Sequence, residues 1–405
     1  MSGKVRVRGG KPAAASVHDG FNRPNVSIFE RMLLQEVERL GGFLNAHSHL
    51  DRADTLHAKY LAHINTSPLV AASMPLTVKQ NLTGDLHRGL AYNEADLRER
   101  VSALLERQIS YGITRVITCV DACPGIAEDG LLAWRVMREL KKEFAGRLQL
   151  LLGPNAIFGF KEGTERWETY QEAAKTADVL TGLPEKDEFS SFRTRDGRVG
   201  FKQHINRILR LAIELDKPVQ LHLDQADDPR ERGTWRLIEV LESLEVNREL
   251  EPLIRSGEPR IWAVHMISPS GYPEVEFRRL ADKLREYNVG VTVCPTAAIS
   301  MRRYRPLSSP THSCIARVLE LLKLGVRVQL GSDNIADVFV PASNGDMLTE
   351  VMMAAHGLRF YSPTVWAKIV TGHGLNSVDV ATVGDNLYQD SKAFTGIDPE
   401  WQSAV

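Results

Sequence analysis

The feature that most constrains the fold of this 405-residue chain is a regular alternation of short apolar runs with longer amphipathic segments. The short runs are rich in β-branched residues and have the length of strands. In the longer segments, apolar residues recur at three- and four-residue spacing, as they do in helices. We expect eight strands, at 42–47, 114–120, 148–153, 177–183, 218–223, 260–265, 289–294 and 326–331.

Repeated strand–helix alternation predicts parallel strands, because a parallel crossover needs about a dozen residues. Eight such units favour a closed α/β barrel of the (β/α)8 TIM type over an open doubly wound sheet, the alternative. Gly112, Asn288 and Gly325 stand where helices should end. No G-x-G-x-x-G follows a strand and no phosphate-binding P-loop motif occurs, so the usual nucleotide-binding signals are missing. The clearest helices are expected at 93–111, 131–144, 200–215, 274–287 and 313–324.

Two long connections interrupt the rhythm, residues 50–92 after the first strand and residues 184–200 after the fourth. Loops that follow barrel strands lie at the catalytic face, so both are candidates for covering a site. We expect residues 1–26 to be a flexible tail without a secretory signal, residues 27–380 to form the barrel, and residues 381–405 to be a C-terminal extension.

Charge and composition narrow the class of partner to a small molecule. With 50 Lys and Arg against 51 Asp and Glu, the net charge is -1, which gives no electrostatic support for binding nucleic acid. No run of 18 apolar residues occurs, so we expect no membrane span. Barrels of this size often associate, and the sequence leaves a homo-oligomer open. The four cysteines, for which we favour reduced thiols in a cytoplasmic protein over a Cys-x-x-x-Cys metal site, are Cys119, Cys123, Cys294 and Cys314.

The candidate chemistry begins with an H-x-H pair, His47 and His49, at the end of the first strand. Alternation places both imidazoles on the same side, where they can bind one divalent metal ion. The pair alone is equally compatible with two polar loop residues. However, His222 closes the fifth strand, His265 closes the sixth, and Asp333 follows the eighth. Because the catalytic groups of a barrel cluster at the carboxyl ends of its strands, this order favours a metal site.

This order of residues resembles the metal-dependent amidohydrolase superfamily, and more narrowly its branch of cytosine deaminase and N-isopropylammelide isopropylaminohydrolase. The segment GSDNIADVFVPASNGDML, which begins at Gly331, is similar to the branch's segment after strand eight. GITRVITCVDACP resembles its second-strand segment and LLLGPN its third. The resemblance covers about residues 41–380.

The resemblance implies that one divalent metal ion, zinc in preference to iron, is bound by His47, His49, His222 and Asp333. It implies that Asp333 also acts as a base, and that His265 polarises the attacking water or the bond under attack. Asn155 falls where the branch carries a substrate-binding Gln. The side chains expected to contact the substrate are Arg52, Asn155, Asn334, Asp337 and Phe339.

Arg52 stands where relatives of the branch vary, and it either attracts an anionic or carbonyl-rich substrate or forms an ordinary loop salt bridge. The chain departs from the branch in two further respects. Where cytosine deaminases have H-x-x-E, this chain has Gln225, which can form hydrogen bonds but cannot ionise to move a proton. Asp224, expected on the same side of the strand as His222, is either a replacement proton shuttle or a structural residue. The last departure is at the termini, which lack the strands of the usual flanking β-sandwich, so we expect a barrel without it.

We therefore expect a mononuclear metal-dependent hydrolase of C–N bonds other than peptide bonds. Its substrate would be a small cyclic amidine or N-heterocycle, attacked by activated water at a ring carbon with release of ammonia or an amine. Because Gln225 cannot ionise, ring-opening hydrolysis of a cyclic amide is an alternative reaction. A non-catalytic member of the family that binds a small molecule is the alternative of another class. The sequence does not identify the heterocycle or its leaving group.

Overall fold

The computed structural model describes residues 17–189, 196–246, 250–254, 256–300 and 314–395, and all eight expected strands are present in it. Each neighbouring pair is parallel, in the order β1-β2-β3 and β4-β5-β6-β7-β8. The strands are β1 (Phe43–Ser48), β2 (Ile113–Asp121), β3 (Gln149–Asn155), β4 (Leu180–Gly182), β5 (Val219–Leu223), β6 (Ile261–His265), β7 (Val289–Val293) and β8 (Val328–Leu330).

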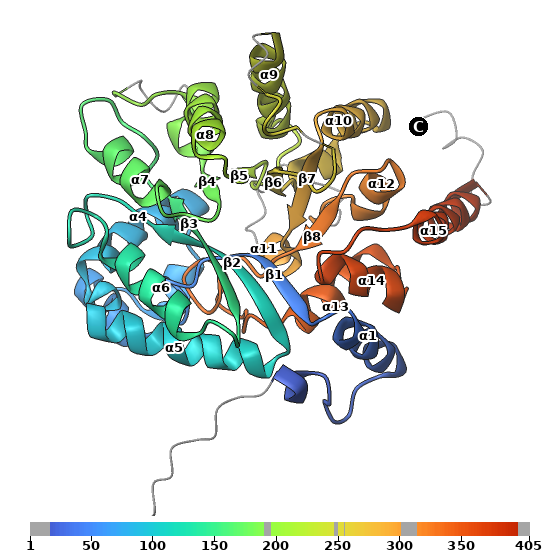
Figure 1. Cartoon of the computed structure of the whole chain (residues 1–405), viewed down its shortest axis with the longest axis horizontal. Helices are drawn as coiled ribbons and strands as arrows, with labels where there is room; N and C mark the ends of the chain where they lie inside the picture. Colours follow the sequence, from blue (N-terminus) through green and yellow to red (C-terminus); the bar gives the residue numbers. More distant parts are fainter. Residues whose placement is uncertain (1–16, 190–195, 247–249, 255, 301–313, 396–405) are drawn as a thin grey trace, which may run out of the picture.

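Helices surround these strands on the outside (Figure 1). The α-helices are α1 (Ile28–Arg39), α2 (Ala58–Leu61), α3 (Pro68–Ala72), α4 (Leu76–Arg88), α5 (Glu94–Ser110), α6 (Leu132–Glu143), α7 (Arg166–Ala174), α8 (Phe201–Leu215), α9 (Gly233–Val246), α10 (Glu274–Glu286), α11 (Pro295–Ser300), α12 (Val318–Lys323), α13 (Met347–Leu358), α14 (Pro363–Val370) and α15 (Ser377–Thr395). Short 3-10 helices are η1 (Val17–Gly20), η2 (Ala62–Ile64), η3 (Leu90–Tyr92), η4 (Pro184–Asp187) and η5 (Ser268–Gly271).

Four of the five helices expected from the sequence, α5, α6, α8 and α10, are confirmed with nearly the same ends. The predicted stop signals also hold, because Gly112, Gly325 and Asn288 all have positive φ, at 82°, 83° and 49°. The fifth prediction, 313–324, is too long. α12 starts at Val318, since Arg317 before it has a non-helical ψ of 66°, and residue 313 lies outside the described residues.

The two hydrogen-bonded sheets meet at two junctions that complete the (β/α)8 barrel. Between β8 and β1, the backbone N–H of Asp333 donates to the carbonyl of His47 at 2.9 Å, and the N–H of His49 donates to the carbonyl of Asp333 at 3.3 Å. Between β3 and β4, the N–H of Asp178 donates to the carbonyl of Leu152 at 2.9 Å. The Asp178 carboxylate in turn accepts the N–H of Leu152 at 2.8 Å, in place of a strand carbonyl.

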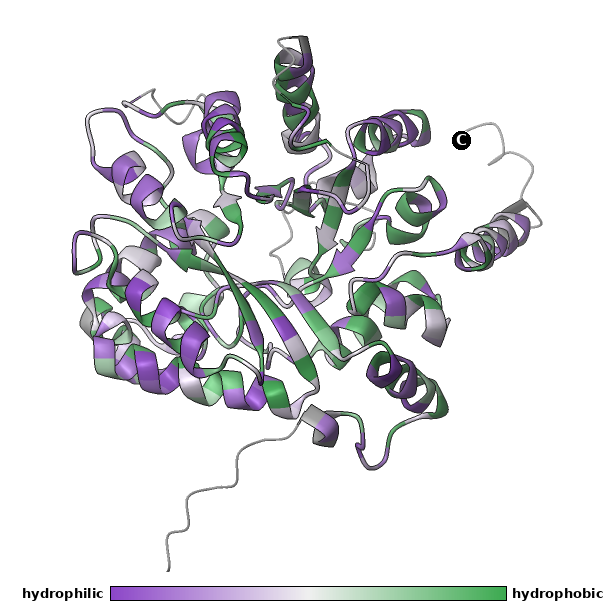
Figure 2. Cartoon of the chain, viewed as in Figure 1, coloured by the Kyte–Doolittle hydropathy of each residue, from purple (hydrophilic) through white to green (hydrophobic). Residues whose placement is uncertain are grey.

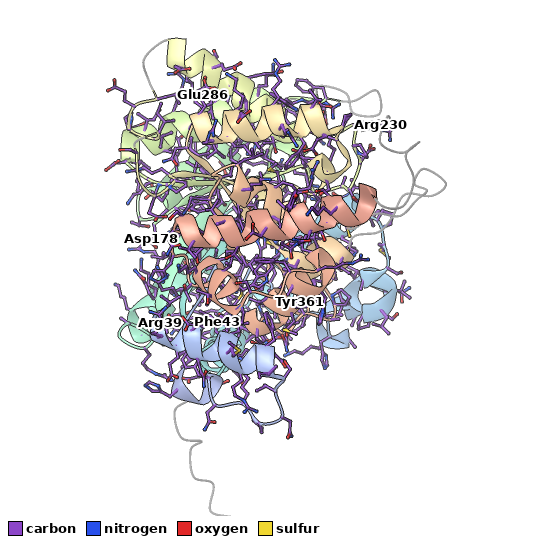
Figure 3. All side chains as sticks on the ribbon, turned by 90° about the vertical axis from the view of Figure 1, so that its right-hand side faces the viewer. Arg39, Phe43, Asp178, Arg230, Glu286 and Tyr361 are labelled. Atoms are coloured by element: carbon purple, nitrogen blue, oxygen red, sulfur yellow. The ribbon has the colours of Figure 1, made fainter. Side chains whose placement is uncertain are left out.

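Apolar residues follow the strands and the helix faces turned toward them, as Figure 2 shows. β5 and β7 are buried along their whole length, as expected for parallel strands covered on both faces. Figure 3 shows that Arg39 and Asp178, which precede β1 and β4, lie at the opposite side of the molecule from Arg230, which follows β5. The carboxyl ends of the strands therefore share one face.

The ends of the described chain pack on the barrel through helices. α1 packs against α14, and α15 packs against α12. Before α1, the Arg23 guanidinium pairs with Asp346 and donates to the carbonyl of Tyr111 at 2.9 Å. Within the described residues, every named strand belongs to the barrel and no helix has the length and apolar character to cross a membrane. The division at residues 26 and 380 stays a prediction.

Gly331 lies where β8 approaches β1 most closely, and this contact generates a prediction. A Cβ built at Gly331 would lie 2.7 Å from the backbone N and the Cβ of His47. We expect Gly331→Ala to push the two strands apart, to lower the free energy of unfolding by about 1–3 kcal/mol, and to displace His47. Denaturant unfolding measures the first effect, and metal content per chain measures the second.

Gly384→Ala in α15 is the matched control, because its added Cβ meets no atom within 4 Å. It should leave metal content unchanged and should not destabilise the protein, since Ala is a better helix former than Gly. Equal stability and equal metal content in both variants would contradict the role assigned to Gly331.

Candidate metal centre and active site

Four side chains from three strand ends converge at the carboxyl face of the barrel. His47 lies in β1, His49 directly follows it, His222 lies in β5 and Asp333 follows β8. The Nε2 atoms of His222 and His49 are 3.3 Å apart. The Oδ1 atom of Asp333 lies 3.3 Å from Nε2 of His49 and 3.8 Å from Nε2 of His47. All four residues are buried. The sequence prediction that these side chains lie together is consistent with this geometry.

Hydrogen bonds on the far side of two imidazoles fix which nitrogen faces the cluster. Nδ1 of His47 lies 2.9 Å from Oε1 of Gln220, whose amide nitrogen donates to the carbonyl of Ala46 at 2.9 Å. Nδ1 of His222 lies 2.9 Å from the carbonyl of Gly182. Since both partners are carbonyl acceptors, Nδ1 carries the proton in each ring, and the Nε2 lone pair faces the cluster.

The donor set fits one divalent metal ion. Nε2 of His222 and Nε2 of His49 lie only 3.3 Å apart, and Nε2 of His47 has no hydrogen-bond partner among the described residues. Three imidazole nitrogens and one carboxylate oxygen form a set that suits zinc and similar transition metals. His265 extends the group, because ligand atoms of His47, His265 and Asp333 lie within 4.8 Å of one another.

Cys119 belongs to the same neighbourhood but on another side of His47. Its Sγ lies 3.9 Å from Nδ1 of His47, the nitrogen that faces away from the cluster. Burial raises the pKa of the Cys119 thiol above its usual range. We therefore assign Cys119 to packing behind the ligand. The Cys-x-x-x-Cys metal site set aside in the sequence analysis gains nothing from Cys123, whose Sγ contacts Nδ1 of His87 at 3.4 Å.

The charge states of the cluster favour metal binding at neutral pH. Burial lowers the pKa of His47 to about 3, and burial likewise holds the pKa values of His222 and His265 below their usual range. Burial alone would raise the pKa of Asp333, but the hydrogen bond with His49 and the nearby His265 hold it well below the usual value. Neutral imidazoles and an ionised carboxylate are the forms that bind a metal ion.

A cavity of about 680 Å³ opens beside the cluster, and His49, His222, His265 and Asp333 form part of its wall. The substrate-contacting residues expected from the sequence are also in this wall, except Asp337. Asp337 lies behind Asn334 and accepts a hydrogen bond from its amide. The predicted residues that the structure brings to the cavity are Arg52, Asn155, Gln225, Asn334 and Phe339.

Asp224 requires a correction. We expected alternation to continue from His222 and to turn Asp224 toward the site, but the strand ends at Leu223 and Asp224 has a φ of 56°. Its carboxylate instead accepts hydrogen bonds from the N–H of Gly233 and, at 2.8 Å, from the N–H of Thr234 at the start of α9. Asp224 does not line the cavity, so the structural alternative for this residue accounts for its position.

Arg52 and Asn155 are held in the cavity wall by one buried carboxylate, Asp121. Nη1 of Arg52 lies 3.2 Å from Asp121, and the Asn155 amide nitrogen donates to it at 2.7 Å. His87 and Tyr92 bind the same carboxylate, at 3.0 Å and 3.3 Å. The sequence analysis offered Arg52 as a substrate contact or as an ordinary salt bridge. The ion pair is present, and Arg52 also lines the cavity.

The sequence analysis named both long connections, 50–92 and 184–200, as candidates for covering a site. Of the two, the segment 50–92 contributes to the cavity wall. Met74, Leu76, Lys79 and Gln80 from this segment line the wall, whereas no described residue of 184–200 does so. Sequence reasoning did not single out these four residues, because nothing in the segment marks which side of its helices faces the site. Gln220 was also missed, although alternation in β5 places it on the same side as His222.

Comparisons with known proteins show which proteins share this fold. No family model matches the chain. An uncharacterized protein of Haemophilus influenzae is 24% identical over 300 residues, which are 74% of this chain and 97% of that protein.

Two solved structures have the same architecture. The 5-methylcytosine deaminase of Klebsiella pneumoniae, bound to 5-fluorocytosine, matches with a TM-score of 0.66 and 20% identity, over 84% of this chain and 74% of that one. The N-isopropylammelide isopropylaminohydrolase of Burkholderia multivorans matches with a TM-score of 0.57 and 18% identity, over 85% of this chain and 74% of that one. The chain therefore shares its fold with these two enzymes, which belong to the branch that the sequence resembles.

The contact between Gln220 and His47 generates a prediction about metal affinity. Gln220→Leu removes the acceptor that orients the His47 ring, so we expect metal affinity to fall about 10–100-fold while folding is retained. His47→Ala with His49→Ala should abolish binding. Elemental analysis of protein purified without added metal, followed by competition with a chelator, measures both effects. Wild-type affinity in Gln220→Leu would contradict the orienting role.

The ion pair of His87 with Asp121 generates a prediction about pH. Burial would lower the pKa of His87, but the hydrogen bond to Asp121 overcomes this and raises it to about 9. A raised pKa means that protonated His87 stabilises the folded state fully below about pH 6.5, and that this contribution is lost as pH rises through 9. We expect the stability advantage of wild type over His87→Gln to shrink by roughly 3 kcal/mol over this range.

Denaturant unfolding of both proteins at several pH values between 6 and 10 measures this difference. A difference that stays constant with pH would contradict the raised pKa of His87 in the folded protein.

Proposed function

We propose that this protein is a mononuclear metal-dependent hydrolase that acts on a C–N bond, other than a peptide bond, of a small cyclic amidine or N-heterocycle. The observation that carries the proposal is the convergence of His47, His49, His222 and Asp333. The last three of these also line a cavity large enough for such a ring. The shared fold with a deaminase and an aminohydrolase supports the same reaction class.

We propose that the metal ion is zinc, because the donor set is rich in nitrogen. When bound, the ion would lower the pKa of a water molecule toward neutrality. Asp333 accepts the proton of that water. The water oxygen forms a bond to the ring carbon, and His265 stabilises the negative charge that develops on the opened C=N bond. The bond from this carbon to the amino group then breaks. Asp333 delivers the proton to the leaving nitrogen, so that ammonia or an amine departs.

Gln225 favours a second candidate reaction. In a deaminase of an aromatic ring, a carboxylic acid at this position passes a proton to a ring nitrogen, and an amide cannot do so. Ring-opening hydrolysis of a cyclic amide needs no such transfer. A third alternative, from another class, is a non-catalytic protein that binds a small molecule in the same cavity. The full set of metal-binding side chains favours catalysis over this alternative.

We further propose a cytoplasmic location, which the four free, buried cysteines support. The oligomeric state stays a prediction from chain size alone.

The proposed role of His265 predicts a selective loss of turnover. His265→Asn should keep the metal, because His265 is not among the four proposed ligands, and should lower kcat about 10²–10⁴-fold on a substrate found by screening heterocycles for ammonia or amine release. The exposed His356 offers a matched control, and His356→Asn should retain full activity. Unchanged turnover in His265→Asn would contradict this role.

The mass of the product separates the three candidate functions. Loss of an amine with gain of oxygen indicates the deaminase-type reaction, and a net gain of water indicates ring opening. Tight binding by calorimetry with no chemical change across the screened rings would favour the non-catalytic alternative.

A further inference from the structure

Of the four amide side chains that line the cavity, three come from three different strand ends. Asn155 ends β3, Gln225 follows β5 and Asn334 follows β8. An amide has a carbonyl end that accepts hydrogen bonds and an NH2 end that donates them. The end that faces the cavity therefore decides which groups a bound molecule must present.

In all three cases the NH2 end is bound to a carboxylate behind the wall. The Asn155 amide donates to Asp121 at 2.7 Å, and the Gln225 amide donates to Glu185 at 2.6 Å. The Asn334 amide donates to Asp337. A carboxyl oxygen accepts each of these N–H bonds, so the NH2 end of each amide is turned toward its carboxyl partner.

Two of the three carboxylates, Asp121 and Asp337, are themselves held in place by further donors. Asp121 binds Arg52, His87 and Tyr92. One oxygen of Asp337 accepts the backbone N–H groups of Phe339 and Val340, at 2.8 Å and 3.1 Å, which leaves its other oxygen for Asn334. Glu185 lies in η4, directly after β4, and does not line the cavity itself.

The carbonyl oxygens are consequently left for a bound molecule. The Asn155 carbonyl oxygen is buried and has no partner among the described residues. No hydrogen bond to the carbonyl oxygen of Gln225 or Asn334 occurs within the described part of the chain either. A buried acceptor that stays unpaired costs about 1–3 kcal/mol, so a molecule that offers N–H groups gains over one that does not.

The cationic side of the cavity lies beside one of these acceptors. Arg52 shares Asp121 with Asn155, and its Nε has no partner among the described residues. Its guanidinium stacks over Phe339 at 5.2 Å, and Lys79 reaches the carbonyl of Phe339 at 3.4 Å. The positively charged hydrogen-bond donor Arg52 therefore lies beside the carbonyl acceptor of Asn155. This pair matches a ring edge that carries a C=O next to an N–H.

Resting on the ring-opening candidate of the proposed function, we infer that the substrate is an oxo-substituted ring whose nitrogens carry hydrogen, as in a cyclic ureide, rather than a ring whose nitrogens accept hydrogen bonds. The amides of Asn155, Gln225 and Asn334 accept its N–H groups. Arg52 donates to its carbonyl oxygen. Glu185, Asp121 and Asp337 act as positioning residues that set this selectivity without touching the ring.

The experiment measures binding to the metal-loaded protein by calorimetry, with 5,6-dihydrouracil, its two monomethyl derivatives and its 1,3-dimethyl derivative as probes. These rings differ only in whether each ring nitrogen carries a hydrogen atom or a methyl group. Wild type should bind the parent ring at least tenfold more tightly than the dimethyl ring, with the monomethyl rings between them. Equal dissociation constants for all four would overturn the inference.

Glu185→Gln tests the positioning role, because the amide introduced by this change can pair with Gln225 in either orientation and no longer holds the Gln225 carbonyl toward the cavity. We expect the parent-to-dimethyl ratio to fall at least threefold. Glu188→Gln is the matched control, with the same change three residues away at a side chain that pairs with Arg236, and its ratio should stay at the wild-type value.

Gln225→Met removes the acceptor directly and should lower the same ratio, so the test does not depend on Glu185→Gln alone. A ratio unchanged in both variants would mean that the methyl groups act by size, and would overturn the inference. Product analysis by mass keeps this test separate from the proposed function. Selective binding without any product contradicts the hydrolase proposal only, and turnover without selectivity contradicts the present inference only.

Discussion

The backbone contact between Asp333 and β1 is the constraint on which the active face depends. Asp333 donates its N–H to His47 and accepts the N–H of His49, so the residue that supplies the carboxylate also fixes the chain that supplies two imidazoles. Gly331 permits this approach, because any side chain there would meet His47. The end of the last strand and the start of the first are thus joined at the point where four ligand atoms must meet within a few ångströms.

Buried carboxylates organise the rest of the cavity wall in the same manner. A carboxylate excluded from water is costly unless several donors bind it, and Asp121 has Arg52, His87, Tyr92 and Asn155 as donors. Because each donor is bound to Asp121, its side chain is fixed in one conformation. The chain therefore holds polar side chains of the cavity in one orientation before any ligand arrives, which is how a binding site avoids losing affinity to side-chain ordering.

The sequence predicts the barrel well, and the structure is consistent with the predicted meeting of four ligand side chains, for a physical reason. Parallel strands place their carboxyl ends at one face, so residues such as His222 and Asp333 could be brought together from their positions in the strand pattern alone. The same reasoning failed for Asp224, because alternation holds only while the backbone stays extended, and its positive φ lies one residue beyond the strand. The pairing of Gln225 with Glu185 joins residues 40 apart through loop geometry that no local pattern encodes. Lys79 was missed because the connection that carries it has no strand register to orient it.

The covering segment has a consequence for how such an enzyme changes over evolutionary time. Met74, Leu76, Lys79 and Gln80 form part of the cavity wall, yet they belong to one continuous stretch of chain that carries no metal-binding residue. Insertions, deletions or exchanges within residues 50–92 can therefore reshape the chamber while the ligands in β1, in β5 and after β8 stay where they are. A lineage with this architecture can change the shape of its cavity by altering a single inserted stretch, and it retains the ligand cluster at the strand ends as an inherited constant.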